Sequence, residues 1–234
     1  VVKGAQVFPH QIKAHMSLRR KPKYAVLDVH PGGGKTVMGI LDIMCLAHEL
    51  GSQYFRPVVI APDKLCRNWC EDTTKISGGN WNCIPITGET VNEWGAERLI
   101  ELVRSAPRNT IIVTGINFLK TKDFTVSMGP SQVKVLGGVE FIKQFNPTYV
   151  LLDESHKAKT FNPGNNHVSQ VHTAIKTIFT MDGIEFARLA TGTLVHGRLT
   201  DVMGQAALFN AYTFKTPSTT TIDINDVDGP SKMR

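Results

Sequence analysis

Residues 24–36 read Tyr-Ala-Val-Leu-Asp-Val-His-Pro-Gly-Gly-Gly-Lys-Thr, an apolar run that leads into three glycines, a lysine and a threonine. The apolar run, residues 24–29, is typical of a buried strand, and residues 36–50, followed by Gly51, have the apolar pattern of a helix. Glycines between a strand and a helix let backbone N–H groups approach an anion with no Cβ in the way. This stretch therefore predicts a strand–loop–helix unit that holds phosphate groups.

The loop also carries the side chains that a bound nucleoside triphosphate needs. Lys35 is expected to reach the β- and γ-phosphates, and the Thr36 hydroxyl is expected to bind Mg²⁺. The backbone around the phosphates is expected to come from Gly32, Gly33 and Gly34. The strict pattern G-x-x-x-x-G-K-[ST] has glycine at the position of Val29, so the loop departs from it there. A plain glycine-rich turn is the alternative interpretation.

A second stretch, residues 148–156, reads Thr-Tyr-Val-Leu-Leu-Asp-Glu-Ser-His. A strand in these residues would place Asp153 and Glu154 at the carboxyl edge of a parallel sheet, where ligands bind in open α/β folds. We expect Asp153 to hold Mg²⁺ and Glu154 to orient and deprotonate the attacking water. An acidic helix start is the alternative, and the presence of Lys35 in the same chain favours the catalytic interpretation.

The rest of the chain alternates short apolar runs with amphipathic segments. This alternation predicts an α/β fold with a mainly parallel β-sheet and helices on both faces. The expected strands are residues 24–29, 57–61, 82–86, 110–114, 148–153 and 185–191. The expected helices are residues 11–19, 36–50, 64–74, 91–105, 138–145, 168–180 and 199–209. Residues 120–139 are expected to form an insertion or surface hairpin, and residues 161–166 a loop rich in turns.

Length and composition fit one large domain. With 234 residues, 41% of them hydrophobic, we expect residues 1–214 to form the domain and residues 215–234 a linker or disordered tail. No apolar run has the length of a membrane span and no signal peptide is visible, so we expect an intracellular protein with no membrane partner. The net charge of +6 permits a polyanionic partner without requiring one. Four cysteines without a C-x-x-C pair predict reduced, structural thiols.

Six segments, in this order, resemble the motifs of the first RecA-like lobe of superfamily-two helicases, and within them the Swi/Snf-type DNA translocases. The segments are residues 8–11, 28–36, 59–69, 110–117, 149–159 and 188–193. The third segment, an apolar strand followed by Ala-Pro and a short helix ending in Asn-Trp, is the most similar to the Swi/Snf type. The resemblance implies a RecA-like P-loop domain that binds ATP and Mg²⁺ and acts as an ATP hydrolase on double-stranded DNA.

The resemblance also assigns roles to single residues. It implies that Gln11 recognises adenine and that His156 joins Lys35, Asp153 and Glu154 in a catalytic Asp-Glu-x-His group. The positions that it assigns to nucleic-acid contact are Lys64, Arg67, Thr114, Gly115 and Asn117. The positions that it assigns to the coupling of hydrolysis with movement are Thr191, Gly192 and Thr193.

Two segments depart from the family and keep other functions open. Val29-His30 stands where the family usually has Asp-Glu, and residues 194–197 replace its Pro and Gln-Asn. These departures favour a divergent viral, phage or bacterial branch. The alternatives are the motor lobe of a restriction or unwinding enzyme, and a nucleotide-dependent binding module with vestigial turnover.

The family works with two RecA-like lobes, and we expect the second lobe to be absent from these 234 residues. The second lobe supplies arginine fingers, and such residues can raise phosphoryl-transfer rates about 10³- to 10⁵-fold. We therefore expect the isolated lobe to be weakly active. A second lobe, in a longer protein or in a partner chain, is expected to complete the site.

Overall fold

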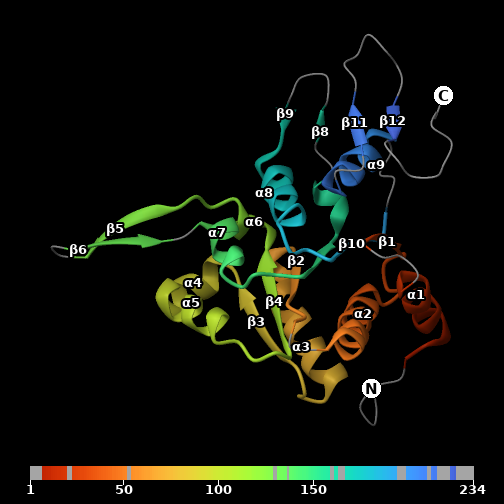
Figure 1. The fold of residues 1–234 in the computed structure, drawn as a ribbon, viewed down its shortest axis with the longest axis horizontal. Helices are drawn as coiled ribbons and strands as arrows, with labels where there is room; N and C mark the ends of the chain where they lie inside the picture. The colour runs from red at the N-terminus through yellow and green to blue at the C-terminus, as the bar shows by residue number, and fades with distance from the viewer. Residues whose placement is uncertain are drawn as a thin grey trace.

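Six parallel strands form one sheet in the order β1-β10-β7-β2-β4-β3 (Figure 1). The strands are β1 (Tyr24–Asp28), β2 (Pro57–Ala61), β3 (Asn82–Ile86), β4 (Thr110–Gly115), β7 (Tyr149–Asp153) and β10 (Phe186–Thr191). This computed structural model describes residues 7–19, 23–51, 54–128, 131–135, 137–158, 161–162, 167–193, 199–209, 212–214 and 222–224. The predicted α/β class is confirmed, and each expected strand is present to within one residue at either end.

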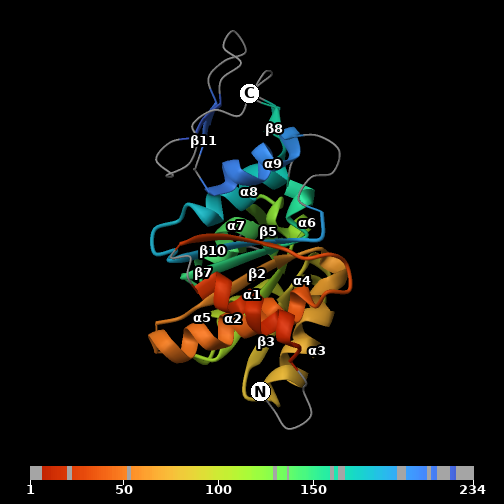
Figure 2. The same cartoon turned by 90° about the vertical axis from the view of Figure 1, so that its right-hand side faces the viewer.

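Helices cover both faces of the sheet (Figure 2). On one face pack α1 (Pro9–Arg19), α2 (Lys35–Leu50) and α3 (Cys66–Ser77), the last preceded by the 3₁₀ turn η1 (Asp63–Leu65). On the other face pack α5 (Ala96–Arg104), α6 (Ile116–Leu119), α7 (Gly138–Lys143) and α8 (Gln170–Phe179). On β7, Leu151 packs with the α1–α3 layer and Leu152 with the other. Because side chains alternate along a strand, Asp153 points toward α2 and α3.

The remaining elements lie around this sandwich. They are α4 (Gly88–Trp94), α9 (Leu199–Ala206), the 3₁₀ turns η2 (Ser155–Ala158) and η3 (Ala207–Phe209), and the pairs β5 (Phe124–Met128) with β6 (Ser131–Val135), β8 (Phe161–Asn162) with β9 (His167–Val168), and β11 (Tyr212–Phe214) with β12 (Ile222–Ile224). The hairpin expected within residues 120–139 is β5-β6. Strand β12 lies in the segment expected to be a linker or disordered tail, whose other residues are outside the described ranges, as are residues 194–197.

The single helix expected over residues 91–105 is wrong. The helix is interrupted at Gly95, which has φ 83° and ψ 142° and separates α4 from α5. Helix α4 begins at a capping box, in which Thr87 and Thr90 exchange side-chain and backbone hydrogen bonds. A local cap and a glycine with positive φ outweigh the continuous apolar pattern here.

The expectation of four reduced thiols is also wrong. Cys70 of α3 and Cys83 of β3 form a disulfide, with their Cα atoms 5.1 Å apart. Cys45 and Cys66 are free, and burial raises the pKa of the Cys66 thiol to about 12, so this thiol stays protonated. The spacing of the cysteines along the chain did not predict this disulfide, because the disulfide depends on how α3 packs against β3.

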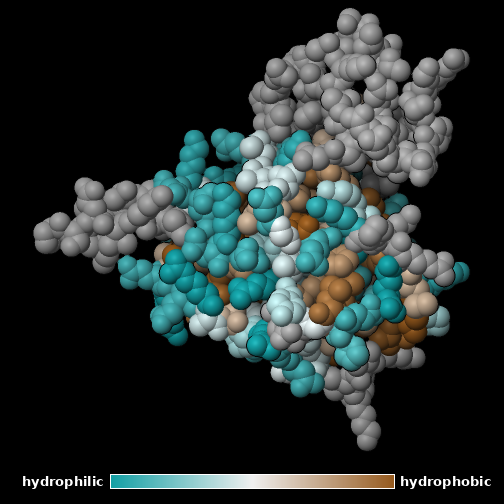
Figure 3. All heavy atoms as spheres, viewed as in Figure 1, coloured by the Kyte–Doolittle hydropathy of each residue, from teal (hydrophilic) through white to brown (hydrophobic). Residues whose placement is uncertain are grey.

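The surface is uneven in character. Hydrophobic residues gather over the part of the molecule where α1 and α2 lie, whereas hydrophilic residues predominate around α4 and α5 (Figure 3). Phe8, Ile12 and Met16, at successive i, i+4 positions on and just before α1, are each about half exposed, at 49%, 52% and 49%. Within the described ranges, no helix combines the length and apolar character that a membrane crossing needs.

Candidate nucleotide-binding site

The glycine loop makes a tight turn into α2. Gly34 has φ 83° and ψ 35°, a left-handed conformation, and stands at the N-cap of the helix. The N–H of Gly33 donates to the carbonyl oxygen of His30 at 3.0 Å. A Cβ on Gly33 would collide with the side chain of Val29 and lie 3.1 Å from the His30 oxygen. The loop thus has no room for a side chain at position 33.

Helix α1 lies over this loop and supplies the residue predicted to recognise adenine. The Gln11 side chain is buried, its Oε1 accepts the backbone N–H of Phe8 at 3.0 Å, and its Nε2 lies against the position that a Cβ on Gly34 would take. Nε2 of His10 lies 3.2 Å from the carbonyl oxygen of Gly33, a contact that sequence reasoning missed. Gln11 is therefore placed directly beside the glycine loop.

The structure brings the predicted catalytic residues together at the carboxyl ends of β1 and β7. Lys35 Nζ lies 3.4 Å from Glu154 Oε1, and His156 Nδ1 lies 3.2 Å from Glu154 Oε2. Glu154 has φ 51°, in the left-handed region that residues with a side chain seldom adopt. Backbone strain of this kind often occurs at functional sites, where the surrounding structure holds it in place.

Asp153 is almost fully buried beside this group, at 3% exposure. Its Oδ2 accepts the indole N–H of Trp69 at 2.9 Å, and its Oδ1 accepts the backbone N–H of Glu154 at 2.9 Å. Burial raises the pKa of the Asp153 carboxyl, while the Trp69 hydrogen bond and the charge of Lys35 act to lower it. This role of Trp69 is not visible in the sequence, because only the fold brings Trp69 to Asp153.

The segment predicted to couple hydrolysis to movement touches both sides of the site. Thr191, at the end of β10, places its Oγ1 3.3 Å from Nδ1 of His156. The same oxygen accepts the backbone N–H of Thr193 at 3.1 Å. A Cβ on Gly192 would lie 3.3 Å from Lys35 Nζ, so this residue is close to the lysine predicted to bind phosphate. Any movement of this segment would therefore be felt at Lys35 and His156.

The residues predicted to contact nucleic acid lie near one another but differ in accessibility. The Oδ1 of Asp63 accepts the N–H of Asn117 at 3.0 Å, and a Cβ on Gly115 would collide with the same carboxylate, so η1 lies against the end of β4. Lys64 and Asn117 are exposed. Thr114 is fully buried, so its side chain does not reach the surface in this conformation.

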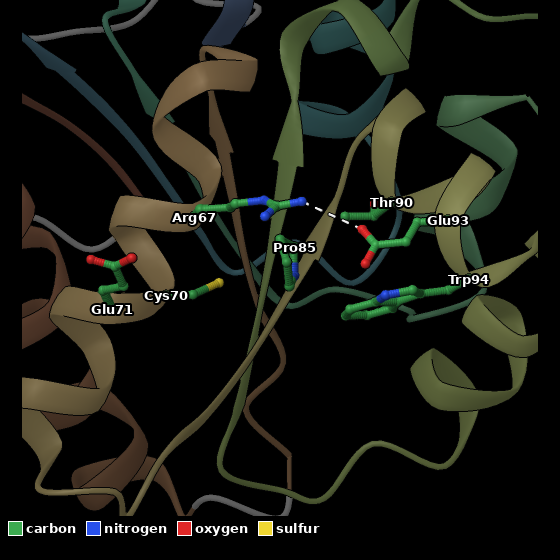
Figure 4. Close-up of a pocket in the computed structure, with 7 residues that line it drawn as sticks. All are labelled: Arg67, Cys70, Glu71, Pro85, Thr90, Glu93 and Trp94. Carbon is green, nitrogen blue, oxygen red and sulfur yellow. Dashed lines mark hydrogen bonds and ion pairs between the residues drawn. The ribbon is translucent and has the colours of Figure 1, made fainter.

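Arg67, the fifth of these residues, is exposed but already paired. Its Nη2 lies 3.5 Å from a carboxylate oxygen of Glu89 and 3.4 Å from one of Glu93, both on α4. Figure 4 shows the Arg67–Glu93 pair across a pocket that Trp94 also lines. Exposed ion pairs of this kind contribute little to stability, so a phosphate group could displace the two carboxylates from Arg67.

The residues present fit a magnesium ion that binds together with a triphosphate. Within the described part of the chain, no cluster of three or more His, Cys, Asp or Glu side chains could hold a metal ion. Mg²⁺ in nucleotide sites uses one or two protein oxygens together with phosphate oxygens and waters, so such a cluster is not needed. Buried Asp153 and half-buried Thr36, the second residue of α2, offer oxygens of this kind.

The fold is similar to that of a solved structure. The Sulfolobus solfataricus SWI2/SNF2 ATPase core in complex with dsDNA matches this chain with a TM-score of 0.52 and 14% sequence identity. The match covers 88% of this chain and 36% of that one, so this chain spans about a third of its length. No protein-family model and no curated protein matches the sequence. At this identity the likeness shows the fold, and the expected RecA-like α/β class is confirmed.

Proposed function

We propose that the chain is the ATP-binding lobe of a DNA-dependent, helicase-like ATPase, which couples ATP hydrolysis to movement on double-stranded nucleic acid. The observation that carries this proposal is the pairing of Lys35 with Glu154, 3.4 Å apart, beside a glycine loop that begins a helix. A helix N-terminus, a lysine and two adjacent carboxylates are the groups that triphosphate hydrolysis requires.

Each residue of the site has a role in this proposal. The terminal phosphates replace Glu154 as the partner of the Lys35 ammonium. Glu154, released from that pair, accepts the proton of the attacking water, and His156 orients its carboxylate from 3.2 Å. Asp153 and Thr36 hold Mg²⁺, which when bound neutralises charge on the phosphates. The Gln11 amide, beside the loop, contacts the adenine base.

The contacts of His156 support a mechanical connection between the nucleotide site and residues 191–193. Its Nδ1 lies within 3.3 Å of both the Glu154 carboxylate and the Thr191 hydroxyl. A change at the γ-phosphate that moves Glu154 would thus alter the contact with the segment that contains Thr191, Gly192 and Thr193. We propose that this segment contacts a second RecA-like lobe. Without that second lobe, this chain is expected to hydrolyse ATP slowly.

Double-stranded DNA is the proposed nucleic-acid partner, because the structure that shares the fold is a complex with dsDNA. Exposed Lys64 and Asn117, with Arg67 once it leaves Glu89 and Glu93, would contact phosphates. Phosphate contacts carry no sequence information, so Lys64→Ala should weaken binding to all DNA sequences alike. The slope of log affinity against log salt concentration should also become shallower by about 1, the value for one lost phosphate contact. A loss confined to one DNA sequence would contradict this role.

The test of the proposed function is ATP turnover with and without double-stranded DNA, measured by phosphate release. The wild-type chain should turn over ATP slowly and faster with DNA, and Glu154→Gln should reduce turnover by about 10²- to 10⁴-fold, as expected for loss of a general base. Glu185→Gln, an exposed residue just before β10 at the opposite edge of the sheet, is the matched control. Turnover that survives Glu154→Gln, or a chain that binds no ATP, would overturn the proposal.

A nucleotide-dependent binding module is the second candidate, and Val29 is the observation that favours it. Val29 stands where the strict loop pattern has glycine, and its side chain lies against Gly33. The same experiment separates the two functions, because a binding module would bind ATP without turnover both with and without DNA.

A further inference from the structure

We propose that Trp69 is a positioning residue, which holds the Asp153 carboxylate in the orientation that Mg²⁺ binding requires. The inference rests on the proposed function, since it concerns the same nucleotide site. Trp69 lies on α3, outside both the glycine loop and the carboxylate segment. It does not touch the nucleotide in this proposal, and it acts only through Asp153.

Two hydrogen bonds fix the carboxylate. The Trp69 indole N–H donates to Oδ2 of Asp153 at 2.9 Å, and the backbone N–H of Glu154 donates to Oδ1 at 2.9 Å. Trp69 and Asp153 are 2% and 3% exposed, so water does not compete effectively for these bonds. Each carboxylate oxygen has two lone pairs, so each keeps an acceptor position for a metal or its bound water.

The indole is itself held in place by close packing. A Cβ on Gly39 of α2 would lie 2.9 Å from Cη2 of Trp69 and 3.0 Å from Cδ1 of Leu151, so the ring fills the space between α2 and β7. One turn further along α3, the Thr73 hydroxyl donates a hydrogen bond to the Trp69 carbonyl oxygen at 2.8 Å. A supporting residue whose own rotamer is locked can hold a ligand-binding group precisely enough for function.

A purely structural role for Trp69 makes a different prediction. Trp69 belongs to the buried cluster of the α1–α3 layer, and a buried indole N–H needs an acceptor in any case. If packing were its whole role, its replacement would weaken nucleotide binding equally with and without metal. If it positions Asp153, only the metal-dependent part should change. Residues that orient metal ligands typically contribute about 10- to 100-fold to metal affinity.

The experiment measures the affinity for a non-hydrolysable ATP analogue as a function of Mg²⁺ concentration, and again in EDTA. Trp69→Phe keeps an aromatic ring and removes the N–H donor. We expect it to raise the Mg²⁺ concentration at half-saturation about 10- to 100-fold and to leave the affinity in EDTA unchanged. Trp94→Phe, a partly buried tryptophan on the other layer, is the matched control and should change neither value.

The outcomes separate this inference from the proposed function. If the wild-type chain binds the analogue with a Mg²⁺ dependence that Trp69→Phe leaves unaltered, the inference is overturned and the proposed function stands. A wild-type chain that binds no analogue overturns the proposed function itself. If Trp69→Phe does not fold, replacement of Trp69 by β-(3-benzothienyl)alanine keeps the indole shape without the N–H. An equal loss of affinity with and without Mg²⁺ in that protein would also overturn the inference.

Discussion

Glu154 has a backbone conformation that its side chain makes unfavourable. Its φ of 51° lies in the left-handed region, which an L-residue with a Cβ adopts at a free-energy cost of about 1–2 kcal/mol. Glycine at this position would avoid that cost and lose part of the gain to its greater freedom in the unfolded chain. Strain of this kind is common at functional sites and agrees with the role proposed for the Glu154 carboxylate.

The strain at Glu154 predicts an unusual order of stability between two variants. Glu154→Gly and Glu154→Ala both lose the carboxylate, and we expect the free energy of unfolding of the glycine variant to be higher by about 1 kcal/mol. Urea denaturation measures both. At the exposed α5 residue Glu101 the order should reverse, because alanine is favoured over glycine within a helix by about 1 kcal/mol. Greater stability of the alanine variant at position 154 would contradict the assigned strain.

Gly33 lacks room for a methyl group. In Gly33→Ala the new Cβ would collide with the Val29 side chain and approach the His30 carbonyl oxygen, so the loop must shift. We expect nucleotide affinity to be lost and the free energy of unfolding to fall by about 1–3 kcal/mol, as for other overpacked sites. Gly88→Ala is the control, since nothing lies within 4 Å of a Cβ there. Unchanged nucleotide binding in Gly33→Ala would mean that the loop does not hold phosphates.

The disulfide joins α3 to β3 and should stabilise the edge of the sheet. Cys70 and Cys83 are 13 residues apart, and a crosslink over about 15 residues is expected to contribute about 3 kcal/mol. Cys83→Ser should therefore lower the free energy of unfolding by about that amount under oxidising conditions. Under reducing conditions wild type and variant should be alike, and Cys45→Ser, which changes a free thiol, serves as the control. A wild type insensitive to reduction would argue against the crosslink.

The fold should lose stability in acid because of His172, which is buried between α8 and α9. Nε2 of His172 lies 3.1 Å from the carbonyl oxygen of Gly204, and burial lowers the pKa of His172 below its usual 6.5. The unfolded chain then binds the proton more readily. The stability that neutral His172 provides is present above pH 6.5 and is lost as pH falls below that value. His172→Gln keeps a donor for Gly204 without titrating, so its melting temperature should fall less between about pH 7.5 and 5. An unchanged pH dependence would exclude His172 as the cause.

Local pattern predicted most of the elements, and it failed where distant contacts or backbone geometry decide. The strands were predictable because most are short apolar runs, and β2, β4 and β7 are buried along their whole length in the parallel sheet. The break at Gly95 and the Cys70–Cys83 disulfide were not, since they depend on a cap and on the packing of α3. The pairing of Lys35 with Glu154 was anticipated from motifs, whereas the Trp69 hydrogen bond to Asp153 needed the fold.

At the scale of the whole molecule, one buried polar group links elements from both ends of the described chain. Asp42 of α2 is fully buried, and its Oδ2 accepts the Tyr149 hydroxyl of β7 at 3.0 Å and Nε–H of Arg188 of β10 at 3.3 Å. Arg188 also donates to the carbonyl oxygen of Lys23, just before β1, at 2.9 Å. His15 of α1 has its Nδ1 3.7 Å from Asp42 Oδ1. These contacts tie the loop-bearing helix α2 to the strands that end at Asp153 and Thr191.

Removing one charge of this group should destabilise the fold more than removing both. Arg188→Met leaves the buried Asp42 carboxylate without its cation, and breaking a buried pair in this way typically lowers the free energy of unfolding by about 3–5 kcal/mol. Asp42→Asn with Arg188→Met removes both charges and keeps an acceptor for the Tyr149 hydroxyl, so much of the loss should be recovered. Denaturation of the single and double variants completes the cycle. A double variant as unstable as the sum of its parts would mean that Asp42 and Arg188 contribute independently to stability.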